Sequence, residues 1–210
     1  MVSDKQQYWV LRETPQQQAI FNWWIGLELH KGERAALRRC ETVSAAMEQV
    51  GFHRLSFALR RLTLKVSDEA IANVASVLAY LKPSVDLINE KPEQRFGKLM
   101  QNYTTRLAVQ MGSERESGAE KPLISELRFQ RLLQAASQSD DDFSVQLRRI
   151  VCHLDGKATV NPVLVADDIF YRFWALSNPD YYSGSKSFNF KLAKDYYQET
   201  FTYQKDEQGA

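Results

Sequence analysis

Cysteine, glycine and proline are all scarce in this sequence of 210 residues. The two cysteines, Cys40 and Cys152, lie far apart and without CxxC spacing, which excludes a disulfide framework and the usual kind of zinc site. Nine glycines and six prolines are fewer than the many turns of a β-sandwich or barrel require. This scarcity favours a helical protein.

Long apolar runs and a surplus of charge of one sign are also missing. No run is long enough to cross a bilayer, and residues 1–9 lack the basic start and apolar core of a secretory signal. We therefore expect a cytoplasmic protein without membrane contact. The 27 basic and 26 acidic residues leave a net charge of +1, so a prediction of a nucleic-acid partner depends on where the charges lie.

The sequence motifs that commonly mark an enzyme are absent. There is no GxxxxGK[ST] phosphate loop, no GxGxxG turn, no HExxH helix and no GxSxG elbow. His30, His53 and His153 lack metal-ligand spacing, and the three aspartates at 140–142 fit the N-terminus of a helix better than a magnesium site. We expect no catalysis, no metal, no cofactor and no small-molecule substrate; an enzyme would need a constellation assembled from distant helices.

Apolar residues recur at helical spacing along most of the chain. Ile20, Trp23, Trp24 and Leu27 fall at i, i+3, i+4 and i+7, which is typical of one helix face. Similar stripes predict a helix that runs from about Leu37 through Val50 and ends at Gly51. They predict others over about 52–62, 67–82, 96–107, 123–133, 140–154 and 162–176. No alternating run favours a strand, so the sequence predicts an all-α protein.

One segment, residues 111–122, interrupts the helical pattern. Its two glycines and several charges are typical of an exposed loop. We predict a single helical domain over 1–210 that can divide into two packed lobes, 1–110 and 123–182, joined near this loop. The tail, 183–210, is rich in tyrosine, phenylalanine and lysine, and both an additional helix and a frayed end fit it.

Arginine residues occur in small clusters. Guanidinium groups bind phosphate bidentately and stack on bases, so such clusters indicate contact with a nucleic-acid backbone. The alternative is that each arginine pairs with a nearby carboxylate, such as Glu33, Glu41 or Asp155, on a solvated face. The clusters are Arg34 with Arg38 and Arg39, Arg60 with Arg61, Arg128 with Arg131, Arg148 with Arg149, and more weakly Arg95 with Lys98.

Several segments together carry a family resemblance. Trp23-Trp24 is followed by KGERAALRRC at 31–40, and SELRFQRLLQA stands at 125–135. The LRR at 147–149, the aromatic stretch 170–174 and Tyr181-Tyr182 follow in the same order. In these segments, about residues 20–182, the chain resembles the CasB family, the small subunit of the type I-E CRISPR effector complex Cascade.

The resemblance implies an all-helical, non-catalytic subunit. Copies of such a subunit line the middle of Cascade beside the guide RNA and target DNA, and help to hold the displaced strand of the R-loop. The implied partners are the other Cascade subunits, a second copy of this chain, CRISPR RNA, target DNA and the displaced strand. Guide pairing would read the sequence, leaving this chain to contact the backbone.

Ten residues form the predicted nucleic-acid interface. Arg38 and Arg39 match the family's basic pair, and Arg128 and Arg131 match its second motif. The other six follow from clustering: Arg34, Arg60, Arg61, Lys98, Arg148 and Arg149. The alternative function is that of a helical protein-protein adaptor without nucleic-acid contact, in which the arginines pair internally.

Overall fold

The computed structural model describes residues 8–156 and 159–204, which fold into twelve α-helices and one 3-10 helix. In chain order these are α1 (Thr14–Gly26), α2 (Lys31–Arg39), α3 (Val43–Met47), α4 (Val50–Arg60), α5 (Asp68–Leu78), α6 (Val85–Ile88), α7 (Pro92–Asn102), α8 (Leu107–Gly112), α9 (Glu126–Gln138), α10 (Asp140–Leu154), α11 (Pro162–Ser177), η1 (Gly184–Lys186) and α12 (Phe188–Thr200). The described residues contain no β-strand, and one antiparallel bridge joins Glu114 to Pro122. The all-α prediction is confirmed. None of the described helices has both the length and the apolar character that a bilayer span requires.

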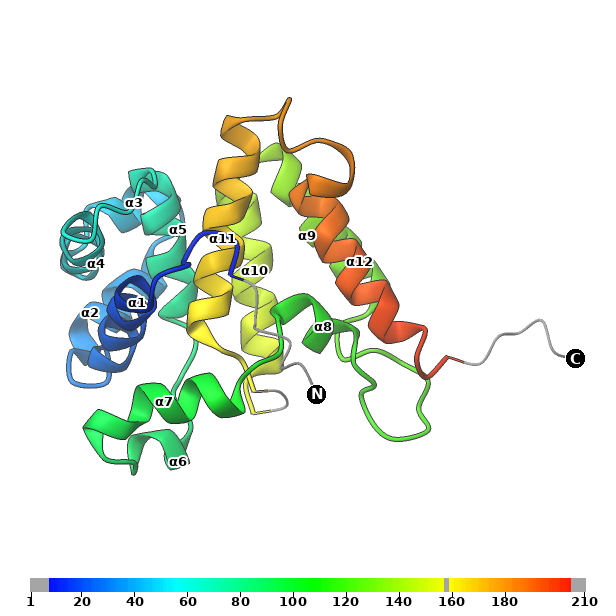
Figure 1. Ribbon diagram of the computed structural model, residues 1–210, viewed down its shortest axis with the longest axis horizontal. Coiled ribbons are helices and arrows are strands. Elements are labelled where there is room, and N and C mark those ends of the chain that lie inside the picture. Colours follow the sequence, from blue (N-terminus) through cyan, green and yellow to red (C-terminus); the bar gives the residue numbers. More distant parts are fainter. Residues whose placement is uncertain (1–7, 157–158, 205–210) are drawn as a thin grey trace, which may run out of the picture.

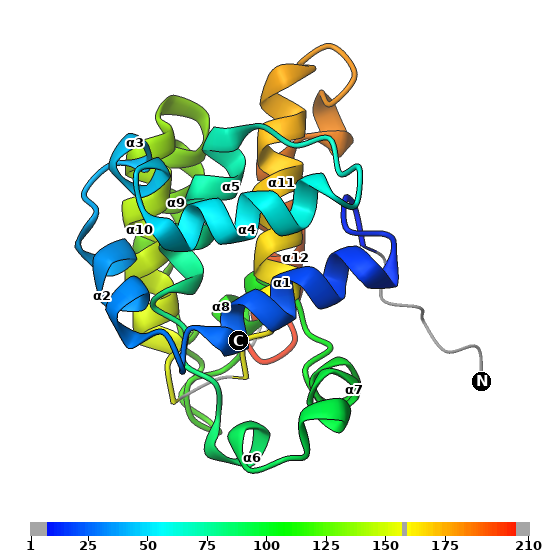
Figure 2. The same ribbon diagram turned by 90° about the vertical axis from the view of Figure 1, so that its left-hand side faces the viewer.

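Two central helices, α5 and α11, are buried almost all round. Every residue over 70–78 in α5 and over 162–173 in α11 is buried. Figure 1 shows α11 between the group α1–α5 on one side and α9 and α12 on the other. In Figure 2, α1 and α4 lie in front of the central helices; α1 contacts α11, and α4 contacts α5. Helices that are buried on nearly all sides form the core, where each face has a packing partner.

The predicted helix ending at Gly51 is wrong in its boundaries. The chain leaves the helical conformation at Cys40, and Gly51 lies in the first turn of α4 instead of after a helix end. Its carbonyl accepts a hydrogen bond of 2.8 Å from Trp23 Nε1, and an added Cβ would lie 2.8 Å from Leu37 Cδ1. Gly51 is therefore needed for close packing of α4 on α2, not for a left-handed helix end.

The segment predicted as a loop begins later than expected, and the tail packs onto the rest of the chain. Met111 is fully buried, and α8 continues to Gly112. Helix α12 packs along α8, where a Cβ at Gly112 would collide with the carbonyl oxygen of Tyr196. Tyr196 in turn stacks on Phe129 of α9, with ring centroids 4.0 Å apart. Of the two alternatives for the tail, its described part, up to residue 204, forms an additional helix.

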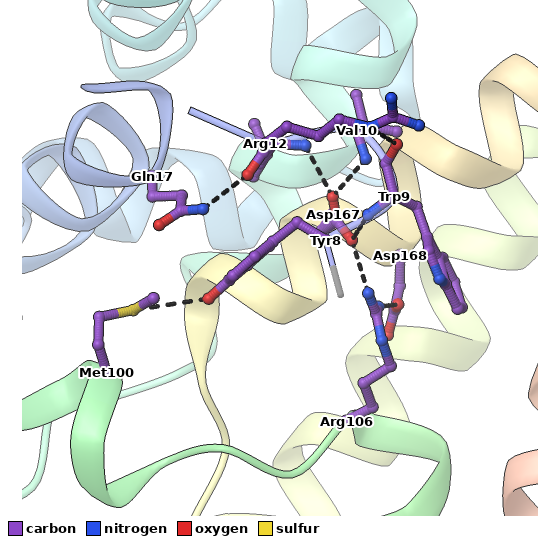
Figure 3. A network of polar contacts seen from close by, with 10 residues as sticks. Tyr8, Trp9, Val10, Arg12, Gln17, Met100, Arg106, Asp167 and Asp168 are labelled. Atoms are coloured by element: carbon purple, nitrogen blue, oxygen red, sulfur yellow. Dashed lines mark hydrogen bonds and ion pairs between the residues drawn. The ribbon is translucent and has the colours of Figure 1, made fainter. Parts of the chain in front are cut away.

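A buried polar network attaches the N-terminal segment to α11 (Figure 3). The carboxylate of Asp167 accepts hydrogen bonds of 2.8–2.9 Å from the backbone N–H groups of residues 9–11. Arg106 forms ion pairs with Asp167, at 2.8 Å, and with Asp168. Its guanidinium also lies 3.7 Å from the ring centroid of Trp9. The two aspartates inside α11 are thus compensated by side-chain and backbone partners.

Candidate nucleic-acid interface

Six of the ten predicted binding residues line one groove of about 940 Å³. We name it the arginine groove. Among the described residues on its walls, Glu41 is the one carboxylate. The six residues come from three helices: Arg38 and Arg39 from α2, Arg128 and Arg131 from α9, and Arg148 and Arg149 from α10.

Helical periodicity explains why α9 and α10 present these side chains. Arg128 and Arg131 are one turn apart on α9, whose other face buries Phe129 and Leu132 in the core. On α10, the residues at 145, 149, 152 and 153 share one face, and all of them line the groove. The amphipathic pattern of both helices therefore places the arginines on the outside of a packed helix pair.

Arg172, from the central helix α11, fixes the turn between α9 and α10. Its Nε donates to the carbonyl of Ala136 at 2.8 Å, and its Nη1 pairs with Asp140 at 2.7 Å. The single residue Ser139 joins the two helices, and its hydroxyl accepts from the backbone N–H of Asp142. These contacts set the angle at which the two arginine-bearing helices meet.

The C-terminal end of α2 is held by side chains from two other parts of the chain. The hydroxyl of Tyr80 donates to the carbonyl of Arg38 at 2.6 Å, and Arg148 Nη1 donates to the carbonyl of Cys40 at 2.6 Å. Terminal carbonyls of a helix lack partners within the helix, so these bonds satisfy them. They also fix the backbone from which Arg38 and Arg39 project into the groove.

The aspartates at 140–142 begin α10, and one of them also contacts a segment far away in the sequence. All three lie in the first turn of α10, as expected for dipole compensation. In addition, Asp141 accepts a hydrogen bond of 2.6 Å from the backbone N–H of Val43 at the start of α3. This bond ties the α2–α3 junction to α10 beside the groove.

Five of the six arginines are exposed, and Arg148 differs from them. Arg148 is 7% exposed, and burial lowers its pKa. Two of its nitrogens, Nε and Nη2, have no hydrogen-bond partner in the described part of the chain. The guanidinium of Arg38 lies 4.9 Å and that of Arg148 5.9 Å from the ring centroid of Tyr80. Arg148 therefore belongs to the floor of the groove, where it supports α2.

The other four predicted residues lie outside the groove. Three of them pair with carboxylates, as the alternative interpretation expected, although not with the carboxylates named for it. Glu33, for example, pairs with Arg54 at 3.1 Å. The four residues are Arg34, which is buried and paired with Glu28, Arg60 with Asp68 at 2.7 Å, Lys98 with Glu90 at 3.0 Å, and Arg61, which lies 5.7 Å from the ring centroid of Phe57.

Sequence reasoning missed two residues of the groove. Tyr80 follows the apolar stripe of α5, so nothing in the pattern distinguishes it from a core residue. His153 lines the groove with its Nδ1 3.4 Å from Arg128 Nη1. In the part of the chain that the structure describes, no three histidine, cysteine or carboxylate side chains come together as metal ligands.

One known protein family matches most of this chain. A family model described as CRISPR-associated protein Cse2 matches residues 33–197, a range that includes all six arginines of the groove. The chain belongs to the Cse2 family. Cse2, also named CasB, is a structural subunit of the type I-E Cascade complex, so the resemblance found in the sequence is confirmed. No curated protein and no solved structure matches this Cse2-family chain.

Proposed function

We propose that this Cse2-family chain holds a single-stranded nucleic-acid backbone in the arginine groove. Within Cascade, it contacts the backbone of CRISPR RNA or target DNA and stabilises the displaced strand of the R-loop, without catalysing a reaction. One observation carries this proposal: five exposed arginines from three helices line one groove with one carboxylate among them. Guanidinium groups left without carboxylates suit the phosphates of another molecule.

The proposed interface recognises charge and shape. Arginines on a groove wall neutralise phosphates whatever the base sequence, and guide pairing supplies sequence recognition. A nucleic-acid strand is also a repeating ligand. A second copy of this chain, placed head to tail beside the first, would bind the next stretch of the same strand. We therefore include a second copy and the other Cascade subunits among the proposed partners.

The salt dependence of binding tests the proposal. If five arginines each neutralise one phosphate, the logarithm of affinity for single-stranded DNA falls with the logarithm of salt concentration with a slope of about −3.5. Fluorescence anisotropy with labelled oligonucleotides of differing sequence measures this slope. We expect the Arg38→Glu, Arg39→Glu variant to bind more weakly, with a slope of about −2, and to weaken retention of target DNA by assembled Cascade.

A matched control separates groove arginines from charge in general. Lys65 and Lys82 are exposed, lie outside the groove and are not among the ten predicted binding residues, so Lys65→Glu, Lys82→Glu makes the same charge change elsewhere. We expect this control to keep the parent's slope. Equal losses in both double variants would contradict the groove as the binding site. A parent slope near zero, or strong preference for one short sequence, would overturn the proposed function and favour the adaptor.

A further inference from the structure

A second cleft, of about 770 Å³, opens beside the arginine groove. Arg128 and His153 line both hollows, so the two are adjacent. The loop between α8 and α9 forms one wall of the second cleft, and the end of α12 forms the other. We name it the aromatic cleft, after Tyr197 and Phe201 on its α12 wall.

Phe201 lies at the outer end of an anchored set of aromatic rings. It is 69% exposed, and its ring stacks on Tyr197 with centroids 6.0 Å apart and planes 26° apart. The hydroxyl of Tyr197 donates to Glu126 Oε1 at 2.8 Å and accepts from Gln130 Nε2 at 2.6 Å. Tyr197 also packs edge-on against Phe129, at 6.0 Å. An exposed phenyl ring on a fixed support offers a flat apolar surface to a planar ligand.

Positively charged side chains in the aromatic cleft suit a phosphate backbone. Arg128 lies where the two hollows meet, and Arg115 and Lys121 line the aromatic cleft further along. Two carboxylates, Glu120 and Glu126, also line it, and Glu126 accepts the hydrogen bond from Tyr197. The aromatic cleft therefore offers both cations and an exposed aromatic face beside the arginine groove.

We propose that the aromatic cleft receives an unpaired base of the strand held in the arginine groove, with this base stacked on Phe201 and its phosphate on Arg128. This inference rests on the proposed function and adds the site at which a base is contacted. The bases of a duplex are stacked on each other, so the occupant is single-stranded. Stacking accepts any base, which agrees with binding that does not depend on sequence.

The test uses the full chain and a single-stranded oligothymidine that contains one 2-aminopurine. We expect the parent to quench 2-aminopurine fluorescence at one position, and Phe201→Leu to remove this quenching and weaken binding by about 5- to 100-fold. Because no phosphate contact is lost, the salt slope of Phe201→Leu stays that of the parent, whereas Arg128→Gln lowers its magnitude by about 0.7. Phe201→Trp should restore quenching and affinity.

The outcomes separate this inference from the proposed function. If the parent does not bind the oligonucleotide, the proposed function fails. If Phe201→Leu binds and quenches like the parent, the arginine groove stands and the stacking site is refuted. If Phe201→Leu binds DNA normally but no longer enters Cascade, the cleft is a protein contact and the stacking site is again refuted. Circular dichroism and melting temperature check that Phe201→Leu is folded.

Discussion

The arginine groove and the network around Arg106 use the same residue type in opposite ways. Arg106 is largely buried, faces two carboxylates from α11 and packs over Trp9 (Figure 3). In the groove, five exposed arginines share walls on which Glu41 is the one described carboxylate. The partners around a guanidinium, not the residue type, decide whether it stabilises the fold or is left for another molecule.

This difference has energetic consequences. Removing one member of a buried ion pair leaves an uncompensated charge in a poorly solvated place, which is strongly destabilising. Removing an exposed arginine without a carboxylate partner costs the fold little. Substitutions in the two regions should therefore separate stability from binding.

The largest expected effect comes from breaking the network. Arg106→Met leaves Asp167 and Asp168 without their guanidinium, and we expect the free energy of unfolding to fall by about 3–5 kcal/mol. Urea denaturation followed by circular dichroism measures this loss. Arg39→Met, the same substitution at an exposed position, is the control and should change stability by less than about 0.5 kcal/mol. Equal stabilities for the two variants would mean that the network does not stabilise the fold.

A comparable effect, spread over several pH units, should appear in the pH dependence of stability. Burial, together with Asp167 and Asp195, raises the pKa of Asp168 to about 7 although Arg106 opposes the change. The folded chain therefore keeps a proton that the unfolded chain releases near pH 4, so stability falls as pH rises from about 4 to about 7 and then levels off. The fall is on the order of 4 kcal/mol, since each pKa unit corresponds to about 1.4 kcal/mol.

Asp168→Asn isolates this contribution, because the amide cannot ionise. We expect the variant to lose the part of the pH dependence between about pH 4 and pH 7 that the parent shows, whatever its stability at any one pH. Melting temperatures of both proteins across that range give the comparison. Parallel curves would show that Asp168 keeps the same protonation state in the folded and unfolded chain.

The same contrast explains what could be predicted from the sequence. Arginines that are neighbours in sequence, such as Arg128 with Arg131, were found because helical spacing puts them on one face. Arg106 and Arg172 stand alone in the sequence, and their carboxylate partners lie 61 and 32 residues away. No local pattern reveals such partners, so the sequence did not predict the structural roles of Arg106 and Arg172.

The predicted boundaries of the helix ending at Gly51 were wrong for a related reason. The stripe from Leu37 to Val50 suggested one helix, but Val50 is 60% exposed and the chain turns at Cys40. Arg148 bonds the carbonyl of Cys40 from α10, a contact between residues 108 positions apart. Tertiary hydrogen bonds therefore stabilise the break, and it is this break that brings Arg38 and Arg39 to the groove.

The smallest expected effect sharpens the comparison at the groove itself. Arg38→Glu, Arg39→Glu should lower the free energy of unfolding by about 1.5 kcal/mol at most. The lost contact of Arg38 with the ring of Tyr80 contributes about 0.5–1 kcal/mol, and negative charge at a helix C-terminus costs a few tenths more. The bonds from Tyr80 and Arg148 reach backbone carbonyls, so they survive the substitution.

Thermal denaturation of this variant, beside Arg38→Gln, Arg39→Gln, decides between two roles for the pair. Glutamine removes the positive charge without opposing the helix dipole, so the glutamine variant should melt closer to the parent. It should still bind single-stranded DNA more weakly than the parent, because two phosphate contacts are lost. If both variants instead melt as early as Arg106→Met, Arg38 and Arg39 are structural residues. If both melt and bind DNA like the parent, they do not form the interface. A variant that stays folded and binds single-stranded DNA more weakly would support a role of Arg38 and Arg39 in binding phosphate.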